Sequence, residues 1–260
     1  MTIFILRKKT IISIFIFLTI ILSSFNYLKN NNVIAIELSE NNIINNNTLE
    51  KISNLVYGTE KIAYLTFDDG PNPNITPKVL DILEEENIKA SFFVIGKSVK
   101  SYPNIVKRAY DDGHFIANHG SSHDNSLLYK TKENFINEIK KTDIEIGKAL
   151  DIKNYCSHVF RFPNGLMAPA YKEQKTNALK LLSDLNYSYI DWNCLNKDSE
   201  KHYSSRELLE NLKASCDGKT TLVILMHDTK DVSNSSEILR ESIQFLKNKG
   251  YTFKNFYDVI

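Results

Sequence analysis

The amino-acid sequence predicts an α/β fold in which a parallel sheet closes, completely or incompletely, into a (β/α) barrel. Short β-rich apolar runs alternate with amphipathic helical patterns from residue 61 onward, which is typical of parallel strands joined by right-handed helical crossovers. Six or more such units follow one another, and this number favours closure of the sheet. Ionisable side chains also follow the apolar strands directly, as they do in barrel enzymes.

The first half of the domain is expected to contain the strands 62–67, 90–96 and 114–119 and the helices 76–86 and 102–113. The strand segments are rich in aromatic and β-branched residues, whereas the helical segments place apolar residues three or four positions apart. We expect Thr76 to be the N-cap of its helix and Pro77 to occupy the first helical position. Gly113 marks the end of the next helix.

The second half is expected to contain the helices 131–150, 173–186, 204–216 and 235–250, and strands around Val159, around Tyr189, at 220–227 and at 251–253. The run "TTLVILMH" is apolar throughout, as expected of a strand buried on both faces. The helix 131–150 carries many charges, and we expect it to present them to solvent on the outside of the domain.

Composition excludes some functions and partners. The chain has 260 residues, 42% of them hydrophobic, with a net charge of +1, so nothing favours nucleic acid as a partner. The three cysteines, Cys156, Cys194 and Cys216, form no recognisable disulfide framework and no CxxC metal motif. The oligomeric state is left open.

The N-terminus predicts an extracytoplasmic protein. A basic cluster precedes the apolar run 10–24, so residues 1–25 are expected to be a signal peptide or an uncleaved membrane anchor. The run is short for a membrane span, which needs ~20 residues, and the two alternatives stay open. Residues 26–60 form an Asn-rich polar linker with little capacity to pack. The globular domain then spans residues 61–260.

Two strand ends together predict a metal site. Asp68 and Asp69 follow the first strand, and His119 and His123 follow the third. Alone, the Asp pair is typical of a turn, and HxxxH without the Glu of HExxH is a weak signal. Together, two imidazoles and one carboxylate suit a divalent metal, with zinc as the first candidate and cobalt or another divalent ion as alternatives. The second carboxylate is then free to act as a base.

Other strand ends carry further candidates. The strand near Val159 is followed by Arg161, and the strand 220–227 ends in His227. Without further information, a surface role for Arg161 and a core role for His227 are reasonable alternatives. Asp191 and Trp192 follow the strand near Tyr189, and core packing of the Trp is the first alternative to sugar stacking.

Five motifs in order resemble the polysaccharide deacetylase family, carbohydrate esterase family four. They are "TFDDGP" (66–71), the stretch from "SFFVIG" to "NHGSSH" (91–123), "FRFPNG" (160–165), "DWNCLNKD" (191–198) and "VILMHD" (223–228). The resemblance covers about Lys61 to Tyr257 and implies a distorted or incomplete (β/α) barrel of the polysaccharide deacetylase type, with residues 61–260 as the catalytic domain.

The resemblance also implies roles for single residues. Asp68 would be the general base, oriented by Arg161, while Asp69, His119 and His123 would bind the metal. In the second half of the site, the general acid would be His227, paired with Asp198, and the oxyanion would accept a hydrogen bond from the Asn164 N–H. An apolar contact for the acetyl methyl would come from Leu225, and Trp192 is a candidate substrate contact.

Three departures from the family pattern matter. Gly120 stands where the family usually has Ser or Thr, so the loop loses one internal hydrogen bond, worth ~1 kcal/mol, unless Ser121 or Ser122 substitutes for the missing hydroxyl. Asn164 stands where an aromatic residue or Gly is common. Leu195 and Ser199 replace an acid and a Trp, which leaves Asp191 as a competitor of Asp198 for the pairing with His227.

The sequence therefore predicts a metal-dependent hydrolase that removes N-acetyl groups from amino-sugar polymers, either cell-wall peptidoglycan or a secreted N-acetylglucosamine polysaccharide. The partner is an acetylated glycan, with the membrane as a second partner if the N-terminal segment is uncleaved. An O-acetyl esterase with the same site and a wall-binding module without turnover are the alternatives.

Overall fold

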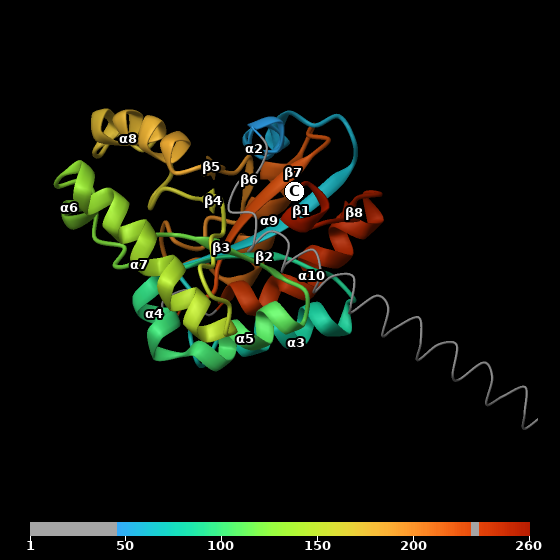
Figure 1. Ribbon diagram of the computed structural model, residues 1–260. Coiled ribbons are helices and arrows are strands. Elements are labelled where there is room, and N and C mark those ends of the chain that lie inside the picture. Colours follow the sequence, from blue (N-terminus) through green and yellow to red (C-terminus); the bar gives the residue numbers. More distant parts are fainter. Residues whose placement is uncertain (1–45, 230–233) are drawn as a thin grey trace, which may run out of the picture. The chain divides into compact units, whose positions relative to one another are not determined.

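The computed structural model describes residues 46–229 and 234–260, so the predicted signal or anchor at 1–25 lies outside the described residues (Figure 1). The described residues contain an eight-stranded sheet with the order β5-β4-β3-β2-β1-β7-β6, and β8 pairs with β1. All pairings are parallel. Because no pairing joins the end strands β5 and β6 in this part of the chain, the sheet is an open, curled half-barrel. This confirms the predicted incomplete (β/α) barrel.

The strands are short except for the two at the centre. They are β1 (Ile62–Asp68), β2 (Ser91–Val94), β3 (Phe115–Asn118), β4 (Val159–Phe160), β5 (Ser188–Tyr189), β6 (Cys194–Leu195), β7 (Leu222–His227) and β8 (Thr252–Phe253). The central pair β1 and β7 is buried along almost its whole length. The continuous apolar sequence of these strands is explained by burial on both faces, because helices cover the outer face of the sheet and side chains fill its inner face.

Helices pack around the outer face of the sheet, and one further helix, at the start of the described residues, packs against the inner core (Figure 1). They are α2 (Asn46–Ser53), α3 (Thr76–Glu85), α4 (Gly96–Ser101), α5 (Pro103–Asp111), α6 (Asn125–Leu128), α7 (Lys132–Leu150), α8 (Lys172–Asp184), α9 (Ser205–Cys216) and α10 (Asn234–Asn248), with short 3₁₀ turns η1 (Leu55–Tyr57) and η3 (Phe256–Asp258). Neighbouring helices contact one another in the order α9, α10, α3, α5, α7, α8. Among the described residues, none of the helices combines the length and the apolar character that crossing a membrane requires.

The alternation of side chains along β1 separates two apolar cores. Ala63, Leu65 and Phe67 pack toward the outer helices, whereas Tyr64 belongs to a second cluster inside the curled sheet that also contains Phe256 of η3. Successive side chains of a strand point to opposite faces. The face that carries Tyr64 therefore continues to the last residue of β1, Asp68.

Four predictions about local structure were wrong. Thr76 lies at the first helical position, with Ile75 as the N-cap, because the Thr76 hydroxyl is used elsewhere: it accepts a hydrogen bond from the Asn72 N–H and donates one to Asp228. Cys194 and Cys216 form a disulfide that ties β6 to the end of α9. Their 22-residue separation in sequence gave no sign of this proximity.

The other two corrections concern packing. Part of the predicted linker 26–60 belongs to the domain, because Ile52 of α2 is fully buried in the inner core. The helix 131–150, observed as α7, does not expose all its charges, since Glu138 and Asp143 lie on its buried face.

Candidate active site

The register between the central strands brings two predicted site residues side by side. Asp68, the last residue of β1, is paired with His227, the last residue of β7. Phe67 and Met226 point to the outer core, so Asp68 and His227 lie on the opposite, inner face. The predicted base and acid therefore meet at the carboxyl-terminal edge of the sheet.

The three predicted metal ligands converge at the same edge. One ligand atom from each of Asp69, His119 and His123 can be chosen so that all three lie within 4.8 Å of one another. Asp69 Oδ1 is 3.4 Å from His119 Nε2 and 3.3 Å from His123 Nε2. Asp69 and His123 both adopt positive φ angles, 76° and 54°, which are uncommon for residues other than glycine.

Hydrogen bonding prepares these atoms for a cation. His119 Nδ1 lies 2.9 Å from the carbonyl oxygen of Arg161, which can only accept, so Nδ1 carries the proton and Nε2 keeps its lone pair for a metal. Asp69 Oδ1 is buried and accepts no hydrogen bond. Burial lowers the pKa of His119, but the negative charges of Asp68 and Asp69 outweigh burial and raise the pKa, so two carboxylates face this ring. A divalent metal therefore fits this donor set.

Arg161 is fully buried and forms an ion pair with Asp68. Its Nη1 donates to Asp68 Oδ1 at 2.8 Å and to the Thr66 hydroxyl at 2.8 Å. Its Nε donates to the Ile190 carbonyl, and its guanidinium carbon lies 3.9 Å from the centroid of the Phe93 ring. A planar guanidinium fixed on several sides is a rigid support, so the position of the Asp68 carboxylate is well defined.

The structure pairs His227 with Asp198 and not with Asp191. His227 Nδ1 lies 2.7 Å from Asp198 Oδ1, and the His227 backbone N–H donates to Asp198 Oδ2 at 2.9 Å. Burial lowers the pKa of His227, but the hydrogen bond and the charge of Asp198 outweigh it and raise the pKa to about 9. Nδ1 is occupied, so Nε2, which lies 4.0 Å from Asp69 Oδ2, faces the site.

Asp191 instead supports the loop that carries Asn164. Its carboxylate accepts a hydrogen bond from the Leu166 N–H at 2.9 Å, while the buried Lys175 Nζ donates to the Gly165 carbonyl at 2.7 Å. Asn164 has a φ of 63°, and its side-chain oxygen accepts a bond from Asn125 at 2.8 Å. These contacts hold Asn164 in a backbone conformation with positive φ that is unfavourable for a residue other than glycine.

The two predicted apolar contacts lie nearby. Leu225 precedes His227 by two positions on β7, so both side chains are on the same face of the strand. Trp192 is half-buried and packs against the inner core. A Cβ at Gly165 would approach Trp192 Cη2 to 2.9 Å, so the Trp ring supports the Asn164 loop from beneath.

Sequence reasoning missed several supporting residues. Thr66 contacts Arg161, Lys175 contacts the Asn164 loop, and Glu138 contacts the loop between the two histidines. Lys175 and Glu138 lie on helices whose charged residues usually face water, so only their three-dimensional position reveals them. Thr66, by contrast, stands two residues before Asp68, and strand alternation could have placed it on the same face.

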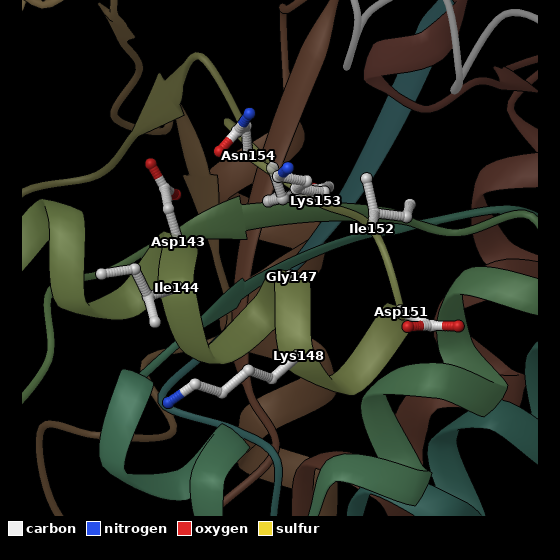
Figure 2. Close-up of a pocket in the computed structure, with 9 residues that line it drawn as sticks. Asp143, Ile144, Gly147, Lys148, Asp151, Ile152, Lys153 and Asn154 are labelled. Carbon is white, nitrogen blue, oxygen red and sulfur yellow. The ribbon is translucent and has the colours of Figure 1, made fainter.

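A cleft of about 360 Å³ lies elsewhere, beside the C-terminal half of α7. Figure 2 shows its lining residues, which include Asp143, Gly147, Lys148 and Asn154. None of the residues predicted for chemistry lines this cleft.

Comparisons with known proteins find relatives in sequence and in structure. A family model described as Polysaccharide deacetylase matches residues 56–190. The peptidoglycan-N-acetylglucosamine deacetylase of Bacillus cereus is 35% identical over 200 residues, which are 76% of this chain and 67% of that protein. The peptidoglycan-N-acetylmuramic acid deacetylase PdaA of Bacillus subtilis is 30% identical over 218 residues, 83% of this chain and 78% of that protein. The solved structure of a Streptococcus mutans CE4 esterase gives a TM-score of 0.70 at 28% identity, covering 84% of this chain and 93% of that one.

Proposed function

The chain belongs to the polysaccharide deacetylase family, whose members are metal-dependent hydrolases, and on that premise we propose that it removes N-acetyl groups from the amino sugars of cell-wall peptidoglycan. The observation that carries the proposal is the convergence of Asp68 and His227 on the Asp69–His119–His123 cluster. Both named relatives act on peptidoglycan, which supports this polymer over other glycans.

We assign the ion site to Asp69, His119 and His123, with zinc as the first candidate and cobalt as an alternative. A divalent metal held there supplies positive charge that polarises the acetamide carbonyl and lowers the pKa of water. The Asn164 N–H donates to the carbonyl oxygen as that oxygen becomes negative. Leu225 receives the acetyl methyl group.

The two proton transfers fall to two different groups beside the cluster. Asp68, oriented by Arg161, takes the proton from the attacking water. His227 donates the proton on Nε2 to the departing nitrogen, and its pKa of about 9 keeps it protonated at neutral pH. Acetate and a free amine are the products, and the amine adds positive charge to the polymer.

We place this reaction outside the cytoplasm. The basic and apolar N-terminal pattern favours export, either with cleavage or as a membrane anchor. The Cys194–Cys216 disulfide supports the same location, because such bonds persist in oxidising compartments.

Acetate release tests the proposal. The metal-loaded protein is incubated with peptidoglycan fragments, with an N-acetylglucosamine oligomer and with acetylated xylan. We expect acetate from the first two and a free amine in the products. Acetate from the xylan alone would identify an O-acetyl esterase, and bound metal without acetate from any glycan would identify a binding module.

A further inference from the structure

The loop that joins the two predicted histidine ligands is anchored by one carboxylate of α7. Glu138 is 4% exposed, and its Oε2 accepts three hydrogen bonds. The Ser121 N–H donates at 3.1 Å, the Ser122 N–H at 2.8 Å and the Ser122 hydroxyl at 2.7 Å. Three donors of one loop therefore converge on a single carboxylate oxygen.

The loop needs this anchor because its backbone conformation is unfavourable. Gly120 has a φ of 81°, and His123 has a φ of 54° although it has a side chain. Such conformations persist only when surrounding contacts determine them. Without Glu138, two N–H groups between the histidines would lose their acceptor.

The remaining polar groups of the loop are held from other elements. The Gly120 N–H donates to the side chain of Asn118, and the Gly120 carbonyl accepts from the Gly96 N–H. Asn118 is oriented in turn by the second buried carboxylate of α7, Asp143, at 2.9 Å. These contacts fix the His119 end of the loop, whereas Glu138 binds the two residues directly before His123.

Glu138 has no basic partner to explain its burial. Within residues 46–229 and 234–260, no Lys or Arg forms an ion pair with it. Burying a carboxyl group is unfavourable unless hydrogen bonds compensate it, and here the three bonds to Oε2 all come from the ligand loop. Packing alone would be served better by an apolar side chain at this position.

We propose that Glu138 is a positioning residue that presets His123 for metal binding. Gly120 has no hydroxyl group, so it supplies no side-chain hydrogen bond within the loop. Glu138 supplies hydrogen bonds to the loop from α7 instead. The inference rests on the proposed function, because it takes His123 as a ligand. Glu138 itself contacts neither metal nor substrate, and it acts through the backbone of Ser121 and Ser122.

Metal affinity, not activity alone, tests this inference. Two titrations are made on metal-free protein: Co²⁺ is followed by the visible absorption spectrum, and Zn²⁺ by competition with a chromophoric chelator. The proteins are wild type, Glu138→Ala, Glu138→Gln and Glu145→Ala. Glu145 lies on the same helix but pairs with Lys148 at the surface, so it is the matched control. Thermal unfolding of each metal-free variant checks that the fold is intact.

We expect Glu138→Ala to lower the affinity for both metals by about 10- to 100-fold, because removing a group that orients a metal ligand typically has an effect of this size. Glu138→Gln retains an acceptor oxygen and should stay within about fivefold of wild type, and Glu145→Ala should be unchanged. If Glu138→Ala fails to fold, Ser122→Ala takes its place, with a loss of about two- to fivefold from one missing bond.

The outcomes separate the two hypotheses. Wild type that binds neither metal would refute the proposed function. Wild type that binds, together with an alanine variant of unchanged affinity and Co²⁺ spectrum, would refute the role of Glu138 alone. If Glu138→Gln bound metal as weakly as Glu138→Ala, the proposed role of Glu138 would also be overturned. The charge of the side chain, and not its acceptor oxygen, would then determine metal affinity.

Discussion

The pairing of Asp198 with His227 gives a prediction that can be measured without any substrate. Asp198 accepts both the side-chain and the backbone hydrogen bond of His227. Burial lowers the pKa of His227, yet the bond and the charge of Asp198 raise it from 6.5 to about 9. The variant Asp198→Asn keeps a side-chain acceptor of the same size but removes the charge, and we expect the pKa of His227 to fall to about 6.5 or below.

The magnitude follows from the two pKa values. At ~1.4 kcal/mol per pKa unit, the difference between 6.5 and about 9 corresponds to about 3 kcal/mol of preferential interaction with the protonated ring. Because the folded-state pKa is raised, this stabilisation is fully present below pH 6.5 and is lost as the pH rises through about 9. At pH 7.5 the protonated fraction would drop from nearly complete to about a tenth in the variant.

Two assays report this change. The imidazole proton signal of His227 is titrated by NMR in metal-free protein, and the pH profile of kcat/KM is then measured with metal. We expect the basic limb of the profile to move to lower pH in Asp198→Asn and the rate at pH 7.5 to fall by about tenfold or more. The control for the titration is Asp191→Asn, which leaves the His227 contacts intact and should change neither the pKa of His227 nor the position of the basic limb. A wild-type His227 that titrates near 6.5, or an unchanged pKa in Asp198→Asn, would refute the reasoning.

Three further predictions concern the base, the oxyanion loop and the disulfide. Asp68→Asn should keep metal affinity within a few-fold while abolishing turnover, whereas His123→Ala should lose both; equal metal loss in the two variants, measured by chelator competition, would contradict the assigned roles. Asp191→Asn should lower kcat by about tenfold with little change in KM, because it loosens a donor used mainly in the transition state; steady-state kinetics showing a change in KM alone would argue against this. Reduction of the Cys194–Cys216 bond should lower the free energy of unfolding by about 3 kcal/mol, measured by denaturant unfolding with and without reductant, and an unchanged midpoint would count against a stabilising bond.

The site could be predicted from sequence because parallel strands collect their carboxyl ends at one edge. Asp69 directly follows β1 and His119 directly follows β3, so strand assignment alone brings them near one another. The pairing of Asp68 with His227 needed one more step, the register of β1 against β7. Local sequence does not specify that register, because β1 and β7 are apolar and buried along almost their whole length and show no alternation.

What could not be predicted depends on contacts between distant segments. The Cys194–Cys216 bond depends on how α9 returns to β6, and local sequence does not specify that return. The burial of Ile52 depends on a space inside the curled sheet that no local pattern reveals. The choice between Asp191 and Asp198 was open for the same reason, because both follow short strands and only their positions around the open barrel distinguish them.

The positive φ angles of Asp69 and His123 explain why the motif alone does not make the site. The local sequence supplies ligand atoms, but it does not favour the backbone that aims them. That conformation is imposed by residues far away in sequence, such as Glu138 on α7, which binds the loop, and Arg161 after β4, whose carbonyl orients His119. A chain that kept all five motifs but lost Glu138 would keep the ligand atoms and lose the geometry, so affinity for metal, rather than the presence of the motifs, is the decisive measure of an intact site.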